Sequence, residues 1–200
     1  MARRLVIGSR NRKKLEELQP LLADLALDLV PVAAFPGVPE IPEDGASFLE
    51  NATKKAVGVA RAVGEWTLAE DSGLVVPALG GAPGIHSAYY AGVHGDDAAN
   101  NAKLQTEVAL LPPAQRDAYY VCVAVLADPS GQPVAQSEGR CHGRLLTEPR
   151  GGGGFGYDPL FWIPEFHRTF GELSPLIKQV LSHRARAIAA LRPALARHLA

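Results

Sequence analysis

A strand signal that passes almost at once into a helix signal opens the chain, and this junction restricts the possible folds more than any other feature. Residues Arg4–Gly8 form a short apolar run typical of a buried strand. Asn11 stands where a helix cap belongs, and leucines recur at helical spacing after it, at Leu15, Leu18, Leu22 and Leu25. A strand feeding an amphipathic helix predicts an α/β architecture, in which helices cover a sheet.

The rest of the chain continues this alternation without repeats, long linkers or low-complexity segments. Three more helices are predicted: from the capping box Ser47–Glu50 through about Val63, after Asp96, and from Ser182 onward. Three more strands are predicted: Trp66–Ala69, Ala118–Ala127 and Pro133–Leu146. Turn residues around Asp128 join the last two strands as a hairpin. The fold class is therefore α/β with a mixed sheet.

Composition and charge agree with an enzyme that binds a small anion. The 200 residues, 47% of them hydrophobic, suffice for one domain or two closely packed lobes, and we expect a single domain over residues 1–200. A net charge of −1 supplies no basic field for a nucleic-acid polymer. Because no stretch resembles a signal peptide or a membrane span, we expect a cytoplasmic protein with no membrane partner. Cys122 and Cys141 are expected to be reduced core residues.

Cations crowd the start of the first helix, where the helix dipole favours acidic residues. They are Arg10, Arg12, Lys13 and Lys14. An anion bound to the exposed N–H groups would relieve this conflict, so the segment Ser9–Lys14 predicts a phosphate-binding junction. The alternative for Arg12 and Lys13 individually is a solvated basic surface.

A glycine-rich segment, Gly151–Asp158, reads GGGGFGYD and precedes Lys178 and the run Ser182–Arg184. Glycines let the backbone approach a ligand closely, an aromatic ring offers a stacking face, and the cations can donate to carbonyl or phosphate oxygens. The segment therefore favours nucleotide binding. The alternative is a flexible hinge beside an ordinary core Phe.

Carboxylates supply a candidate reactive centre. Glu70 and Asp71 follow a strand in a segment, Glu70–Gly73, whose composition predicts a turn. Glu43 precedes the helix that carries Asn51 and Lys55, and its alternative interpretation is an exposed loop acid. Hard oxygen ligands without histidine partners suit Mg²⁺, which takes one or two carboxylates plus phosphate oxygens and water. Adjacent acids are costly unless a cation joins them.

Motifs spread along nearly the whole chain resemble the inosine triphosphate pyrophosphatase family. In chain order they are Ser9-x-Asn11-x-x-Lys14; Glu43-x-Gly45 with Phe48-x-Glu50-Asn51-Ala52 and Lys55; Asp71-Ser72-Gly73-Leu74; Gly80-Gly-Ala-Pro-Gly84 with Ser87-Ala88; Gly154-Phe-Gly-Tyr-Asp158-Pro159; and Lys178 with Ser182-His183-Arg184. The resemblance implies a long mixed sheet flanked by helices in two lobes, with the active site in the cleft between them. It also implies a homodimeric, Mg²⁺-dependent enzyme that converts ITP, dITP and XTP to the monophosphate and pyrophosphate.

The resemblance also implies roles for individual residues. On the triphosphate it places Ser9, Arg10, Asn11, Arg12, Lys13, Lys14 and Lys55. Around the purine it places Phe155, Gly156, Tyr157, Asp158, Lys178, His183 and Arg184. Asp71 would be metal ligand and base, with Lys55 as its catalytic partner. Glu43 would be a second metal contact and Ser72 a substrate contact.

The chain departs from the family pattern at four positions. Arg10 and Lys13 stand where many relatives have glycine, Glu70 where many have Asp, and Tyr89 where many have Arg. Two alternative functions remain open: a nucleoside triphosphate pyrophosphatase of other base specificity, or a catalytically silent nucleotide sensor.

Overall fold

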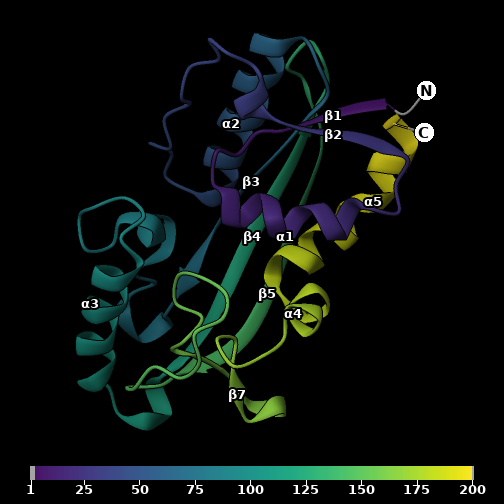
Figure 1. The fold of residues 1–200 in the computed structure, drawn as a ribbon. Helices are drawn as coiled ribbons and strands as arrows, with labels where there is room; N and C mark the ends of the chain where they lie inside the picture. The colour runs from purple at the N-terminus through teal and green to yellow at the C-terminus, as the bar shows by residue number, and fades with distance from the viewer. Residues whose placement is uncertain (1–2, 200) are drawn as a thin grey trace. The chain divides into compact units, whose positions relative to one another are not determined.

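A mixed sheet of seven strands runs through the part of the chain that the computed structural model describes, residues 3–199 (Figure 1). The strands are β1 (Arg3–Ile7), β2 (Leu27–Pro31), β3 (Thr67–Val75), β4 (Asp117–Ala127), β5 (Pro133–Leu145), β6 (Phe161–Ile163) and β7 (Arg168–Thr169). Their order in the sheet is β2-β1-β3-β4-β5-β6-β7. β1 pairs in parallel with β2 and β3, whereas β6 is antiparallel to both β5 and β7. The predicted α/β class with a mixed sheet is confirmed.

Helices flank the sheet, and their starts are set by local capping. They are α1 (Arg12–Leu22), α2 (Phe48–Val63), α3 (Asp97–Ala109), α4 (Pro175–Leu181) and α5 (His183–Leu199). The side chains of Asn11, Ser47 and Asp96 accept hydrogen bonds from backbone N–H groups in the first turns of α1, α2 and α3. These three predicted caps are confirmed, because a cap depends only on residues within one turn.

The prediction of a turn at Glu70–Gly73 is wrong. Strand β3 continues through these residues to Val75, and Leu68 and Leu74 on either side are fully buried. β3 lies between β1 and β4 in the sheet, and its place in the sheet outweighs the local turn preference of Ser and Gly. As a result, Glu70 and Asp71 lie on a central strand rather than in a loop.

Two compact units make up the described chain, and each has its own core. The first comprises the chain up to Asp71, Cys122–Gly139 and the chain from His183; the second comprises Ser72–Val121 and Arg140–Ser182. In the first unit α1 lies along α5 (Figure 1), and Arg192 of α5 donates to the carbonyl of Leu21 at 3.1 Å. The expectation of a single domain over residues 1–200 stays a prediction.

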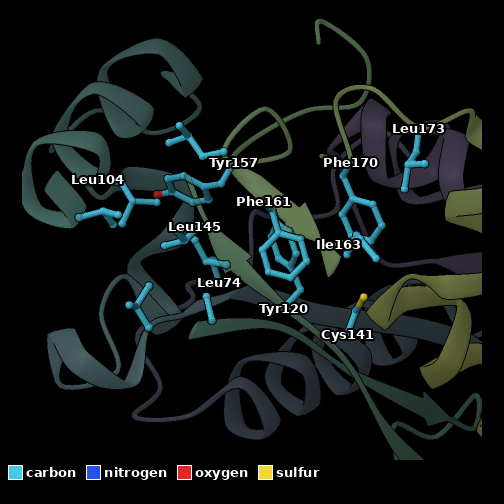
Figure 2. Close-up of a cluster of buried hydrophobic side chains, with 14 residues drawn as sticks. Leu74, Leu104, Tyr120, Cys141, Leu145, Tyr157, Phe161, Ile163, Phe170 and Leu173 are labelled. Atoms are coloured by element: carbon cyan, nitrogen blue, oxygen red, sulfur yellow. The ribbon is translucent and has the colours of Figure 1, made fainter. Parts of the chain in front are cut away.

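Aromatic rings pack against one another in the core of the second unit (Figure 2). The centroid of the Phe161 ring lies 4.7 Å from that of Tyr120 and 5.3 Å from that of Phe170. Tyr157 belongs to the same core, which also receives Leu104 from α3. This packing anchors the chain on both sides of the glycine-rich segment.

Two further expectations concern cysteines and membranes. Cys122 and Cys141 are both buried and neither takes part in a disulfide, as predicted. No helix within residues 3–199 is long and apolar enough to cross a membrane.

Candidate active site

The junction between β1 and α1 is organised by its own side chains. Asn11 Oδ1 accepts from the backbone N–H groups of Lys13, at 3.0 Å, and Lys14, at 3.3 Å. Ser9 Oγ accepts from the Asn11 N–H at 3.2 Å. A Cβ on Gly8 would lie 3.1 Å from that of Ala69, so glycine allows this junction to lie close to β3. The amides of Lys13 and Lys14 are thus engaged in the helix cap.

Asp71 is bound from α2 by two residues one helical turn apart. Asn51 Nδ2 donates to Asp71 Oδ2 at 3.1 Å, and Lys55 Nζ lies 3.6 Å from Asp71 Oδ1. Asn51 Oδ1 also accepts from the Gly45 N–H at 2.8 Å, so one amide joins the preceding loop to the carboxylate. Asn51, Lys55 and Asp71 are all buried. Helical spacing of four places the two donors on one face, as the sequence predicted.

Lys55 also brings Glu43 to this centre. Lys55 Nζ lies 2.9 Å from Glu43 Oε2, so one ammonium group bridges two carboxylates. Burial raises the pKa of Asp71, against the opposing attraction of Lys55 and Lys14. Burial also acts to raise the pKa of Glu43, but the charges of Lys55 and Lys14 and the hydrogen bond to Lys55 together outweigh it, and the net pKa is lowered.

The donors around Asp71 fit a magnesium ion that is completed by substrate. No group of three or more His, Cys, Asp or Glu side chains able to hold a metal occurs within residues 3–199. The carboxylates of Glu43 and Asp71 are nevertheless joined through Lys55, and both offer hard oxygen atoms. Mg²⁺ uses one or two carboxylates and takes its remaining ligands from phosphate and water. Glu43 and Asp71 are therefore the residues that would hold it.

Glu70 lies in a second charged cluster of the first unit. Glu70 Oε1 is 3.3 Å from Lys14 Nζ and 3.2 Å from Arg184 Nη2. The Cys122 thiol donates to Glu70 Oε2 at 3.4 Å, and Arg184 Nη1 pairs with Glu17. Burial acts to lower the pKa of Lys14, but the negative charges of Glu70, Asp71 and Glu43 together outweigh it, and the net pKa is raised. The two adjacent acids are tolerated because different cations accompany each of them.

In the second unit, Asp158 organises the glycine-rich segment. Asp158 Oδ2 accepts from the Phe155 N–H at 2.9 Å and pairs with Lys178 Nζ, while Tyr120 donates to Oδ1 at 3.3 Å. A Cβ on Gly154, where φ is 72°, would lie 2.0 Å from Asp158 Oδ2. Lys178 Nζ lies 4.8 Å from the centroid of the Phe155 ring. A ring face and an ammonium group are thus held next to each other.

The predicted site residues fall into separate local settings. The first unit gathers Lys14, Glu43, Lys55 and Asp71 with Arg184, and the second gathers Phe155, Asp158 and Lys178. Ser72 is half-buried, and His183 is buried at the start of α5. Tyr157 lies in the core and donates to the Ser87 carbonyl at 2.9 Å.

Two of the predicted phosphate-binding cations have other partners. Arg12 is exposed and pairs with Glu16 at 3.0 Å, whereas Arg10 Nη2 donates to the Val38 carbonyl at 2.6 Å. Sequence reasoning did not find Glu17, because its partner Arg184 lies 167 residues away in the chain. The assigned substrate roles of these residues stay predictions.

Comparison with known proteins identifies the family. A model of the Ham1 family matches residues 5–194. A Rhodopirellula baltica protein named dITP/XTP pyrophosphatase is 49% identical over 193 residues, covering 96% of this chain and 93% of that protein. A Desulforamulus reducens protein of the same name is 46% identical, covering 92% of each chain.

Solved structures of similar proteins agree with this assignment. A HAM1 protein from Coxiella burnetii superposes with a TM-score of 0.88 at 38% identity, covering 98% of this chain and 99% of that one. A protein from Mycobacterium abscessus, named nucleoside-triphosphatase / dITP/XTP pyrophosphatase, gives 0.77 at 43% identity, covering 95% and 99%. Because the match extends over nearly the whole chain in both sequence and structure, this protein belongs to the Ham1 family.

Proposed function

We propose that this protein hydrolyses the non-canonical purine nucleoside triphosphates ITP, dITP and XTP to the monophosphate and pyrophosphate. The observation that carries the proposal is the buried Asp71 carboxylate, held by Asn51 and Lys55 beside Glu43. Relatives 46–49% identical over more than nine tenths of this chain are named dITP/XTP pyrophosphatases. A nucleotide sensor without activity would have no use for these convergent carboxylates.

Asp71 would act as the base toward water in this reaction. The water oxygen forms a bond to the α-phosphorus, the bond from that phosphorus to the bridging oxygen breaks, and pyrophosphate leaves with the electron pair. The proton of the water passes to Asp71. Lys14 and Lys55 bind the triphosphate oxygens through charge-assisted hydrogen bonds. Mg²⁺ held by Glu43 and Asp71 would neutralise phosphate charge.

Phe155 and Lys178 would recognise the base. The Phe155 ring offers a face for stacking, and the Lys178 ammonium beside it donates hydrogen bonds. Hypoxanthine and xanthine carry a carbonyl oxygen at the six position, which accepts a hydrogen bond from Lys178. Adenine carries an amino group there, so two hydrogen-bond donors would face each other. A buried donor left unpaired costs about 1–3 kcal/mol, which disfavours adenine. His183 and Arg184 remain candidates for further base contacts.

A competitive hydrolysis panel tests the reaction and its specificity together. ITP, dITP, XTP, dATP, dGTP and dTTP are supplied at equal concentration with Mg²⁺, and the products are separated by chromatography. We expect the inosine and xanthine nucleotides to be consumed first, with pyrophosphate as the co-product. Release of orthophosphate, full activity in EDTA, or preference for a pyrimidine nucleotide would contradict the proposal. Binding of ITP without turnover would favour the sensor.

The setting proposed for this activity is a cytoplasmic homodimer that binds a small-molecule nucleotide and neither a nucleic-acid polymer nor a membrane. A net charge of −1 supports the absence of a polymeric nucleic-acid partner. Light scattering coupled to size-exclusion chromatography measures the oligomeric state. A mass near twice 21.2 kDa is the expected result, and a mass near that of one chain would contradict it.

A further inference from the structure

Two side chains of α3 bind the backbone N–H and the backbone carbonyl of one residue in the glycine-rich segment. Asp97 and Asn101 are four residues apart, so they lie on the same face of the helix. Asp97 Oδ2 accepts from the Gly156 N–H at 3.1 Å, and Asn101 Nδ2 donates to the Gly156 carbonyl at 2.8 Å. Both backbone polar groups of one glycine are thus bound by one helix, within the second unit.

The Asn101 amide is oriented entirely by the bonds it donates. Its Nδ2 also donates to the Asp97 carbonyl at 2.7 Å, and both acceptors are backbone oxygens. A rotated amide would set its oxygen against these two carbonyls, so only one orientation is allowed. In that orientation Asn101 Oδ1 is buried without a hydrogen-bond partner among the described residues. A buried acceptor left unpaired is unfavourable, so packing alone does not account for this arrangement.

Gly156 separates two aromatic residues with different roles. Tyr157 is fixed in the core of the second unit (Figure 2), whereas Phe155 is only half-buried. The Phe155 N–H is bound by Asp158, and the peptide that follows Phe155 is the one whose N–H is bound by Asp97. Gly156 has a φ of 61°, a conformation that side chains disfavour. With its peptides held on both sides, the backbone that carries the Phe155 ring has little freedom to move relative to Lys178.

We propose that Asp97 and Asn101 are positioning residues for purine binding, which bind the Gly156 peptide so that the Phe155 ring faces the base. Neither residue touches the nucleotide; they act through the backbone of the segment. The proposal rests on the proposed function, because it takes Phe155 to be the stacking surface. Its expected consequence is a loss of purine affinity that spares the phosphate-binding residues of the first unit.

Kinetic measurements with dITP, which carries a purine base, and with pyrophosphate, which carries none, test whether base binding alone is affected. The variants are Asp97→Ala, Asn101→Ala, and Thr106→Val as the matched control, because Thr106 Oγ1 donates only to the Ala102 carbonyl on the same helix. Each alanine variant is expected to raise KM for dITP about tenfold with kcat within about twofold of wild type. The inhibition constant of inorganic pyrophosphate, which has no base, should stay within about twofold of wild type. Asp97→Asn keeps an acceptor for the Gly156 N–H and should recover most of the affinity.

Calorimetry with IMP and hydrogen exchange of the segment complete the test. Asn101→Ala should lower the affinity for IMP and accelerate amide exchange in residues 151–158, whereas Thr106→Val should do neither. The positioning role would be overturned if the variants weakened the binding of pyrophosphate and of dITP equally. It would also be overturned if amide exchange became faster while KM for dITP and the affinity for IMP stayed unchanged. If wild type binds IMP but does not hydrolyse dITP or XTP, the proposed activity fails while the IMP comparison still decides the positioning role. If wild type neither binds IMP nor hydrolyses dITP, both proposals fall.

Discussion

Asn51 donates its side-chain amide to the buried carboxylate of Asp71 at 3.1 Å. The same amide accepts from the backbone N–H of Gly45 at 2.8 Å, so both ends of the Asn51 side chain are used. A Cβ on Gly45 would lie 2.6 Å from Asn51 Oδ1. Asn51 therefore connects the loop after Glu43 to the carboxylate on β3, and the distance between the two proposed metal ligands depends on it.

Replacing Asn51 with Ala should destabilise the fold as well as the site. It removes one hydrogen-bond donor to the Asp71 carboxylate and the acceptor of the Gly45 N–H, and a buried polar group left unpaired costs about 1–3 kcal/mol. We expect the free energy of unfolding in urea to fall by about 2–4 kcal/mol. Arg12→Ala, at an exposed ion pair, is the control and should change it by less than about 1 kcal/mol. Equal stability of the two variants would contradict the connecting role.

Asp71→Asn should nearly abolish turnover without unfolding the protein. The substitution preserves shape but removes a proton acceptor and a metal ligand, so kcat should fall on the order of 10³-fold. Pyrophosphate release from dITP under saturating Mg²⁺ measures this loss, and circular dichroism checks the fold. Near-normal turnover would show that another group accepts the proton.

Lys14→Ala and Lys55→Ala should weaken the binding of a nucleoside triphosphate far more than that of a monophosphate. Each change removes a cation proposed to contact the β- and γ-phosphates, which IMP lacks. Calorimetry compares ITP, with Ca²⁺ replacing Mg²⁺ to slow turnover, against IMP. Arg12→Ala should have a milder effect than either lysine variant, since its guanidinium is exposed and paired with Glu16. Equal losses for ITP and IMP would refute the triphosphate role.

Arg184→Ala should be strongly destabilising. Its guanidinium is 1% exposed and pairs with Glu70 and Glu17, and removing one partner of a buried ion pair costs about 3–5 kcal/mol. Chemical denaturation measures the effect. If Arg184 also contacts the base, the ratio of kcat/KM for ITP to that for ATP will fall in the same variant. An unchanged ratio in folded protein would leave the ion pairs as its role.

Phe155→Ala should lower kcat/KM for all purine substrates by similar factors. Stacking on an aromatic ring is worth about 1–3 kcal/mol and does not depend on which purine is stacked. We therefore expect kcat/KM for ITP and ATP to fall by similar factors in a steady-state assay. A large change in their ratio would show that the ring selects the base by shape rather than holding every purine.

Local features of the sequence predicted much of this fold. Asn11, Ser47 and Asp96 were identified as helix caps because a cap is a contact within one turn of chain. The spacing of Asn51 and Lys55 placed them on one face of α2, where both meet Asp71. The family resemblance rested on motifs written in order along the chain. The inferences on caps and helix faces succeed because each depends on the spacing of residues within a few positions of one another.

Tertiary structure alone decided the rest. The turn composition of Glu70–Gly73 is overridden because β3 continues through these residues as part of the sheet. Arg184 meets Glu70 across 114 residues and Glu17 across 167, and Asp97 meets Gly156 across 59. No local periodicity specifies such partners, because they are set by which elements the two cores bring together. Burial then makes these pairings obligatory, since a charge or backbone group removed from water must find its partner within the fold.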